Sequence, residues 1–343
     1  MFSRYKSIKE YIRIPVVEDR GRRPAIFLLM LIVASMAFAQ TRREIVRERV
    51  DSLLRTRYEQ VTYDTLYLAR PQAKLTLKLR GNLSHNSIHA RYEKDGEKFR
   101  SNLNTDARVT FSMGVNYMGL AVGAAINPAH LSGKNKDIEL NLNAYYNRFG
   151  VEAYYQLSKT LSGSMGDTHL EKGSLRLASF YLTGYYAFNY RRFSYPAALM
   201  QSYIQKRSAG SWLVSFAYQG GSIKATDEAP DELDGARLYV GNFAVGGGYG
   251  YNLVAKKWLF HLSIQPNIII FNNNSLKVNG EKNTASYHFP EMMFNTRAAI
   301  IYNMNKKWFF GSTFVMNSTI FGDYNEYTEQ WRWRARAFVG MRL

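Results

Sequence analysis

The sequence contains no cysteine among its 343 residues. This absence excludes disulfide bonds, thiolate metal sites and cysteine nucleophiles. Long apolar runs are also scarce. The strongest of them, residues 25–39, is 15 residues long, whereas a transmembrane helix needs about 20. Hydrophobic residues make up 46% of the chain, which is near the mean of globular proteins. Together these features exclude a polytopic helical membrane protein.

Acidic residues are in deficit, with 27 Asp and Glu against 45 Lys and Arg, and the formal net charge is +18. A basic balance can indicate nucleic-acid binding. Here the basic residues mostly alternate with apolar ones instead of clustering, so we expect no nucleic-acid partner. Aromatic residues are abundant: 25 Tyr, 20 Phe and 5 Trp. Tyrosine suits a wall with one apolar and one wet face, because its ring and its hydroxyl prefer different solvents.

The N-terminus has the pattern of a secretion signal. Arg20, Arg22 and Arg23 precede the apolar run, which ends in Ala37-Phe38-Ala39. A small-x-small ending of this kind predicts a signal peptide over residues 1–39, cleaved between Ala39 and Gln40. An uncleaved inner-membrane anchor is the alternative, and the long basic leader leaves a translation start downstream of Met1 open.

Residues 40–72 are predicted to be a periplasmic segment. Its first part, residues 42–58, places Ile45, Val46 and Val50 at helical spacing and predicts a short helix. From Ala73 onward the period changes to two, as in Ile138–Tyr145, where apolar residues alternate with polar ones. Such alternation is typical of a soluble sheet with one wet face or of a barrel wall between lipid and water.

The last strand favours the barrel. One face carries Trp331, Trp333 and further apolar residues, and the other face carries Arg332, Arg334, Arg336 and Arg342. An arginine facing lipid at the membrane midplane costs about 2–4 kcal/mol. We therefore expect these arginines to face a wet interior. Together with the export signal, this predicts an all-β, antiparallel transmembrane β-barrel over residues 73–343, in the outer membrane of a Gram-negative bacterium.

Tight turns and long loops divide the barrel region. The turns combine an aromatic-Asn pair with basic residues and a following aromatic, as in residues 146–150, 188–193, 251–258 and 302–308, and residues 117–119 look similar. Longer polar loops are expected near residues 93–105, 128–136, 159–173, 223–235, 272–286 and 322–327. With both ends in the periplasm, twelve strands follow: 74–92, 106–117, 119–127, 137–147, 150–158, 174–189, 192–222, 236–253, 256–272, 287–303, 306–321 and 328–343. The seventh span is too long for one strand, so it contains either an inward excursion or a missed hairpin, which would give fourteen.

The seventh span also carries the most recognisable residues: Phe188 to Ala198, Gln201-Ser202 and Gln205 to Ser211. They resemble the signature of a family of uncharacterised outer-membrane proteins known only as a domain of unknown function. Asp64 to Tyr67, Gly247 to Asn252 and Ile301 to Asn303 match as well, so the resemblance covers roughly residues 60–343. It implies an exported, barrel-like protein and no particular activity.

Candidate lumen or constriction residues lie in the seventh span and on the last strand. They are Ser194, Tyr195, Gln201, Gln205, Lys206, Arg207, Ser208, Arg332, Arg334 and Arg336. Residues 193–211 interrupt the alternation, and a polar stretch inside a barrel constricts or plugs it; an extracellular loop is the alternative.

One arrangement in the wall could carry catalysis. His261 and Ser263 lie two apart, on one face of a strand, as a Ser–His dyad requires. That face points into the lumen near a periplasmic turn, away from surface lipid, so we expect no enzyme, and a lipid-modifying hydrolase is a distant alternative. No carboxylate lies at metal-ligand spacing with a histidine, and we expect neither a metal nor a cofactor.

Two functions remain open: a narrow or plugged channel for a small solute, with the arginines setting a preference for anions, or a structural, assembly or surface-interaction barrel without transport. The expected partners are outer-membrane lipid and lipopolysaccharide, and the barrel-assembly machinery and periplasmic chaperones during biogenesis. The sequence leaves the substrate and the oligomeric state open.

Overall fold

The computed structural model describes residue 52 and residues 62–94, 97–117, 120–132, 137–278, 281–284, 287–322 and 326–343. The chain separates into two compact units, Met1–Arg57 and Tyr58–Leu343. The predicted signal peptide, its cleavage site and, apart from Ser52, the helix over 42–58 lie outside the described residues. None of the helices in the described ranges has the length and apolar character to cross a membrane.

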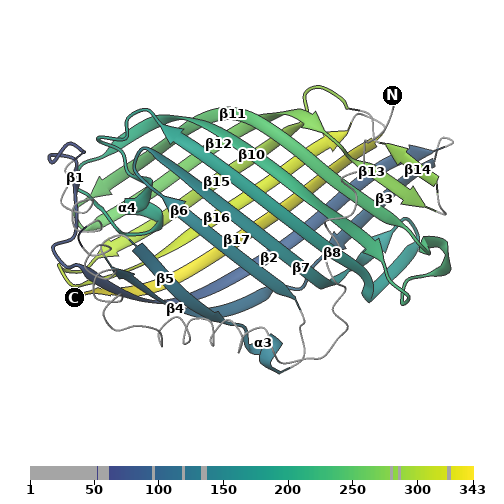
Figure 1. Ribbon diagram of the computed structural model, residues 1–343, viewed down its shortest axis with the longest axis horizontal. Coiled ribbons are helices and arrows are strands. Elements are labelled where there is room, and N and C mark those ends of the chain that lie inside the picture. Colours follow the sequence, from purple (N-terminus) through teal and green to yellow (C-terminus); the bar gives the residue numbers. More distant parts are fainter. Residues whose placement is uncertain are drawn as a thin grey trace, which may run out of the picture. The chain divides into compact units, whose positions relative to one another are not determined.

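The described part of the second unit is almost entirely antiparallel β-structure (Figure 1). Its strands are β1 (Leu68–Ala69), β2 (Leu75–Lys94), β3 (Glu97–Asn104), β4 (Arg108–Tyr117), β5 (Leu120–Ile126), β6 (Ile138–Tyr145), β7 (Phe149–Met165), β8 (Thr168–Ala187), β9 (Ile204–Gln205), β10 (Ala209–Ala225), β11 (Arg237–Ala255), β12 (Trp258–Asn272), β13 (Ser275–Val278), β14 (Glu281–Thr284), β15 (Met292–Asn303), β16 (Trp308–Gly322) and β17 (Glu326–Arg342). The helices are α3 (Pro128–Leu131), α4 (Tyr195–Leu199) and the 3-10 turn η2 (Asp231–Leu233).

The period of two decides which side chains face outward. On β4 and β6 the apolar residues are exposed and the polar residues between them are shielded, and Leu142 of β6 is 73% exposed. The same holds elsewhere in the wall, for example at Trp212 of β10, which is 69% exposed. The molecule is therefore apolar outside and polar inside, the reverse of a soluble protein, and the prediction of an all-β barrel is confirmed.

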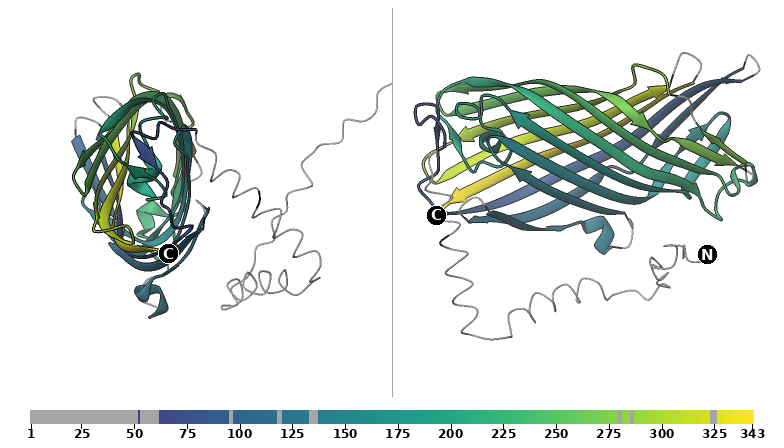
Figure 2. Two further views of the ribbon diagram at one scale, coloured as in Figure 1. Left: turned by 90° about the vertical axis from the view of Figure 1, so that its left-hand side faces the viewer. Right: turned by 45° about the horizontal axis from the view of Figure 1, so that its top comes forward.

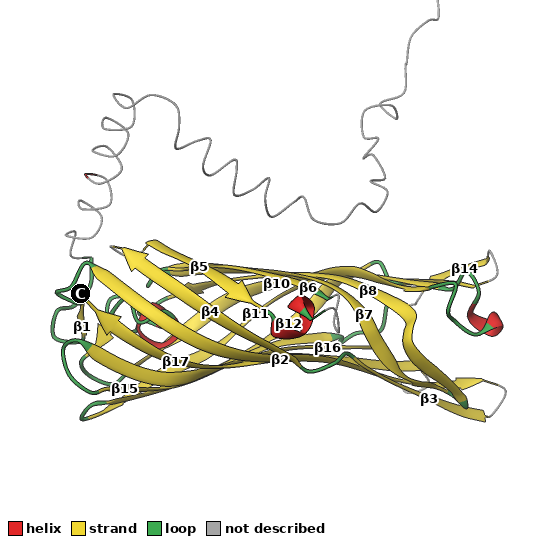
Figure 3. Cartoon of the chain, turned by 90° about the horizontal axis from the view of Figure 1, so that it is seen from below, coloured by secondary structure: helices red, strands yellow, loops and turns green. Residues whose placement is uncertain are grey.

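Ten strands form a closed ring: β10-β8-β7-β3-β2-β17-β16-β15-β12-β11, with β11 returning to β10. The strands are inclined to the long axis of the ring (Figure 3). The chain end takes part in the closure, because the Leu343 N–H donates to the Leu75 carbonyl at 2.8 Å. The last strand, β17, pairs along its length with β2.

The wall changes along the barrel. At one end β3 pairs directly with β7. Beyond the break at residues 105–107, the chain continues as β4, which pairs with β2 and with β5, while β6 pairs with β7. At this second end the wall contains the twelve strands that the sequence predicts, but among the described residues no ladder joins β5 to β6. Their facing edges are separated in Figure 1.

The long seventh span resolves into an inward excursion. Only Ala209 onward belongs to the wall, as β10. Residues 193–208, called the plug below, contain α4 and β9, and the left view of Figure 2 shows α4 within the ring of strands. All five residues of α4 are buried. The two residues of β9 pair with β1, so the segment before the barrel is joined to the plug.

The predicted polar loops at the far end are shorter than expected. Glu97–Asn104 is a strand, β7 and β8 meet at a turn over residues 166–167, and β13 and β14 form a hairpin within the expected loop 272–286. These extensions carry only a few separated apolar residues, such as Leu103, Leu161 and Leu170, which pack against one another, and alternation did not identify them. The short turns that the sequence predicts at residues 146–148, 256–257 and 304–307 all lie at the opposite end, where β2 begins and β17 ends; residues 118–119 lie outside the described residues.

Glycines allow β11 and β12 to approach unusually closely. A Cβ atom at Gly248 would lie 1.9 Å from the Ile264 carbonyl oxygen, and one at Gly246 would lie 2.2 Å from that of Pro266. In the β11–β12 register, Gly246 faces Asn267 and Tyr249 faces Ile264, with no paired residues between them. Pro266 lacks an N–H and cannot complete the ladder there. The glycine run therefore accommodates an irregular contact in the wall.

Candidate functional site

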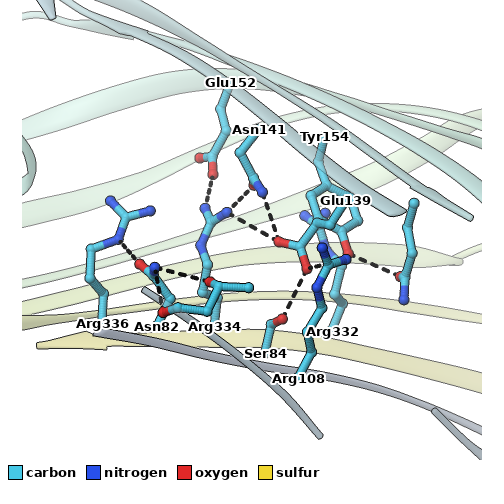
Figure 4. Close-up of polar contacts among 12 residues, drawn as sticks. Asn82, Ser84, Arg108, Glu139, Asn141, Glu152, Tyr154, Arg332, Arg334 and Arg336 are labelled. Carbon is cyan, nitrogen blue, oxygen red and sulfur yellow. Dashed lines mark hydrogen bonds and ion pairs between the residues drawn. The ribbon is translucent and has the colours of Figure 1, made fainter. Parts of the chain in front are cut away.

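The interior of the barrel holds a cluster of arginines around two carboxylates (Figure 4). Since β17 alternates, Arg332, Arg334 and Arg336 all point inward, the direction that the sequence predicts. The carboxylates come from neighbouring strands on the opposite wall, Glu139 from β6 and Glu152 from β7. Residues distant in sequence thus meet only because the sheet closes.

Glu152 is the more deeply buried carboxylate. Its side chain is 3% exposed, and it accepts hydrogen bonds from Arg297 at 3.0 Å, Arg334 at 3.2 Å and the Tyr145 hydroxyl at 2.8 Å. Arg297 is 1% exposed and also donates to the Thr183 hydroxyl at 3.0 Å. Buried charges are tolerated only when they are paired and hydrogen-bonded. This group therefore crosses the lumen as one connected, filled layer.

Glu139 is less tightly held. Arg334 lies 3.7 Å from its carboxylate and Arg108 lies 3.8 Å away. It also accepts from Asn141 at 2.7 Å and from the Ser84 hydroxyl at 2.9 Å. Arg334 thus bridges the two carboxylates and also donates to Asn141.

Arg332 and Arg336 have neutral partners. The guanidinium of Arg332 lies 3.7 Å from the ring centroid of Tyr154 and 4.8 Å from that of Tyr181, and it donates to Asn317. Arg336 donates through Nε to the Asn82 amide oxygen at 2.7 Å. The positive charge of Arg332 is thus covered by aromatic faces, whereas Arg336 keeps donors available.

A cavity of ≈ 560 Å³ adjoins this cluster. We call it the arginine cavity, because its lining includes four arginines, Arg80, Arg108, Arg334 and Arg336, against one carboxylate, Glu139. Polar side chains of β2, β4 and β6 complete most of the lining, and Met200 of the plug contributes to it. The formal excess of positive charge suits an anion, and guanidinium groups bind carboxylate and phosphate through two parallel hydrogen bonds.

Sequence reasoning identified Arg334 and Arg336 but not Arg80 or Arg108. Both lie on the inward face of alternating stretches, Ala73–Arg80 and Arg108–Asn116, so the signal was present. The sequence did not indicate that β4 pairs with β2 and β2 with β17. This pairing brings the two arginines to the same cavity as the arginines of β17.

The plug residues occupy a different level of the barrel from the arginines. Ser194 caps α4 by accepting from the Ala197 N–H at 3.1 Å, and its hydroxyl donates to Asn147 at 2.6 Å. Tyr195 accepts from Gln265 at 2.6 Å. Both are fully buried and belong to an anchored core, not to an open constriction.

Gln201 and Gln205 are also buried, each with polar partners. Gln201 accepts from the Lys78 ammonium at 2.8 Å, and that ammonium also donates to the Met200 carbonyl. Gln205 accepts from Asn252 at 2.9 Å and donates to the Arg192 carbonyl at 2.6 Å. Lys78 is therefore the link between the plug and the wall strand that carries Arg80.

The remaining candidates lie at the exposed side of the plug. Lys206 donates to the Thr65 carbonyl at 2.8 Å, Arg207 offers its carbonyl to Gln205 at 2.9 Å, and the Ser208 hydroxyl accepts from the Val254 N–H at 2.9 Å. Lys206 and Arg207 are exposed. The ten candidates thus fall into two groups, the plug and the arginine cluster, and do not form one site.

His261 and Ser263 lie within hydrogen-bond distance, with 3.2 Å between Nε2 and Oγ. His261 Nδ1 lies 2.7 Å from the Asn252 amide oxygen, and that asparagine donates to the Ser194 carbonyl. Both His261 and Ser263 are buried, under the rings of Phe193 and Tyr195. The pair therefore fastens the plug to β12. Among the described residues, no three His, Asp or Glu side chains are grouped to hold a metal ion.

The chain matches several solved outer-membrane proteins at low similarity. The outer membrane protease OmpT from Escherichia coli is 8% identical, with 83% of this chain and 100% of that chain covered and a TM-score of 0.40. The translocator domain of autotransporter NalP from Neisseria meningitidis is 8% identical (88% and 98% covered, TM-score 0.31). An outer membrane channel from Pseudomonas putida F1 is 14% identical (80% and 98% covered, TM-score 0.32).

No curated protein matches the chain. A family model does match, over residues 62–342, which include the barrel, the plug and the segment joined to it. The resemblance inferred from the plug residues and the glycine run falls within this range. The chain belongs to the family described as Domain of unknown function (DUF4421).

Proposed function

We propose that this protein is an outer-membrane barrel of a Gram-negative bacterium, with a closed lumen, that binds a small anion in the arginine cavity. Three features support the location: the predicted signal peptide, the closed ring and the apolar outward face. The short turns gather at the end where β2 begins and β17 ends. In this orientation that end faces the periplasm, because the short turns of such barrels are periplasmic.

Two obstructions in the lumen support the binding of an anion and not its passage through the barrel. The plug occupies one level of the lumen, and the Glu152 group with Arg297 and Arg334 occupies another. Beyond the Glu152 group, Tyr154, Tyr181 and apolar neighbours form a packed cluster. A ten-strand ring leaves little interior space once such side chains fill it.

We therefore expect the purified protein to show no single-channel steps in planar lipid bilayers. The measurement needs an open porin as a positive control in the same bilayers. Stable steps that high phosphate concentrations block would contradict the closed lumen and would replace binding by anion conduction.

The observation that carries the proposal is the charge of the cavity. Within the described chain, Arg80 and Arg336 have no carboxylate within salt-bridge distance, although both line the cavity. A guanidinium without an acidic partner is costly to keep in a confined space unless a ligand or water satisfies it. A phosphate or carboxylate group would provide both guanidinium groups with the acidic hydrogen-bond acceptor that they lack among the described residues.

Arg80→Gln is the most direct test, because it breaks no ion pair of the described residues. We expect inorganic phosphate to raise the melting temperature of the wild-type protein in neutral detergent at constant ionic strength. The variant should bind phosphate about tenfold more weakly, as expected for the loss of one hydrogen bond to a charged group. Arg100→Gln, an exposed arginine on β3, is the matched control. Equal phosphate binding by Arg80→Gln and the wild type would refute the site.

A structural or assembly barrel without a ligand is the second candidate. The joining of β1 to the plug supports it, because that contact ties Leu68 and Ala69, which precede the barrel, to the barrel interior. We propose no enzymatic role, since His261 and Ser263 are buried and the imidazole is held by Asn252 and by Ser263 itself. The barrel-assembly machinery and periplasmic chaperones remain the proposed partners during biogenesis.

A further inference from the structure

The arginine cavity reaches the outside of the barrel between β5 and β6. Leu140 and Leu142 point outward, being 59% and 73% exposed, yet both line the cavity together with the inward arginines. Ala125 of β5 lines it from the other edge. An interior cavity can include outward-facing residues of β6 only where the wall beside that strand is open.

An apolar groove lies on the outer face beside this opening. It has a volume of ≈ 860 Å³ and extends from β5 across β4, β2, β17, β16 and β15 to Trp258 of β12, and its outward-facing lining includes Ile126, Phe111, Met113, Leu79, Val339 and Phe310. Ile126 of the groove directly follows Ala125 of the cavity. The charged cavity and the apolar groove therefore lie on opposite faces of β5, joined around its free edge.

We propose that the ligand of the cavity is an anionic membrane lipid, with its phosphate headgroup among Arg80, Arg108 and Arg336 and its acyl chains on the outer face along the groove. This inference rests on the proposed anion-binding function and names its substrate class. A free anion would satisfy the arginines but would leave the groove and Leu142 unused. An amphiphile uses both, because its charged and apolar parts match the two faces of the same strand.

The position of the opening along the barrel indicates from which leaflet of the outer membrane the lipid comes. β5 pairs with β4, which lies along the first half of β2, and β6 pairs with the first half of β7, toward the short turns and the C-terminal end of β17. In the proposed orientation this is the periplasmic half of the barrel. The lipid therefore comes from the inner leaflet and is a glycerophospholipid, such as phosphatidylglycerol, and not lipopolysaccharide.

The facing edges of β5 and β6, which share no ladder among the described residues, could instead pair with a strand from another polypeptide. Main-chain pairing of that kind would fill the opening but would need no positive charge behind it. Four arginines in the cavity favour the lipid.

The absence of native cysteine allows a direct test with single labelled cysteines. Ile138→Cys places a fluorophore on the outward face of β6 beside the opening, and Val214→Cys places one on the outward face of β10, which does not line the groove. The full chain is reconstituted into phosphatidylcholine nanodiscs that contain a dibrominated quencher lipid. We expect dibrominated phosphatidylglycerol to quench the label at position 138 at about tenfold lower mole fraction than dibrominated phosphatidylcholine. At position 214 the two lipids should quench equally.

Two variants connect this preference to the cavity. In the Ile138→Cys background, Arg80→Gln should abolish the preference for phosphatidylglycerol, and Arg100→Gln should keep it. If both lipids quench the label at position 138 equally while the protein still binds inorganic phosphate, the proposal of a bound lipid is wrong. The proposed anion site would then stand. Loss of both phosphate binding and lipid preference would overturn the proposed function too. Amide protection of β5 and β6 by a copurified polypeptide, unchanged in Arg80→Gln, would assign the opening to a protein strand.

Discussion

Glu152→Gln is expected to lower the free energy of unfolding by about 3–5 kcal/mol, the cost of removing one partner from a buried ion pair. The variant keeps the shape of the side chain but leaves Arg297 and Arg334 without their shared carboxylate. Arg297 is 1% exposed and cannot turn to solvent. Urea titration of the purified protein, followed by tryptophan fluorescence, measures the change.

Glu171→Gln is the matched control, because that carboxylate is 81% exposed and pairs only with an exposed histidine. We expect it to change the stability by less than about 1 kcal/mol. If Glu152→Gln behaved like this control, the interior cluster would be a solvated network and not a packed layer, and the lumen would be open to water.

Gly248→Ala is expected to prevent β11 and β12 from pairing at their closest point, and so to reduce the yield of folded barrel severely. The added methyl group would lie 1.9 Å from the Ile264 carbonyl oxygen, a backbone atom that cannot move without shifting β12. The readout is the fraction of unheated protein that migrates as the folded form in an SDS gel.

Gly241→Ala on the same strand separates this steric effect from a general effect of replacing glycine. Its new Cβ would have a nearest contact of 3.5 Å, which is ordinary packing. This variant should fold like the wild type. Normal folding of Gly248→Ala would mean that β11 and β12 are farther apart than the structure has them.

The barrel could be predicted because its wall obeys a period of two. Leu142 and Arg334 were assigned to opposite faces from alternation alone, and the strands from β4 to β6 and from β15 to β17 follow the predicted spans. The plug was recognised only as an interruption of this pattern. Its helix has five residues and no period of its own, so nothing local indicated whether it lay inside or outside.

The arginine cavity could not be predicted as a unit. Arg80, Arg108 and Arg334 come from three strands, and their proximity depends on strand order and register. Register is set by the whole closed sheet, since every strand must match two neighbours. The opening between β5 and β6 was hidden for a related reason: alternation assigns faces to a strand but does not say whether its edge is paired.

The break at residues 105–107 has a mechanical consequence. The Thr105 N–H donates to the Asn86 carbonyl at 2.9 Å, so the chain is fixed to β2 at the point where the wall divides. On the side of the break where β3 pairs with β7, the ring is complete. On the side of the short turns, β5 and β6 share no backbone hydrogen bonds among the described residues. Parting any other two neighbours would break a ladder of bonds worth about 0.5–1.5 kcal/mol each. Widening this slit breaks no backbone ladder among the described residues and disturbs only side-chain contacts, such as those of Glu139 with Ser84 and Arg108, so it is the line along which the wall parts most easily.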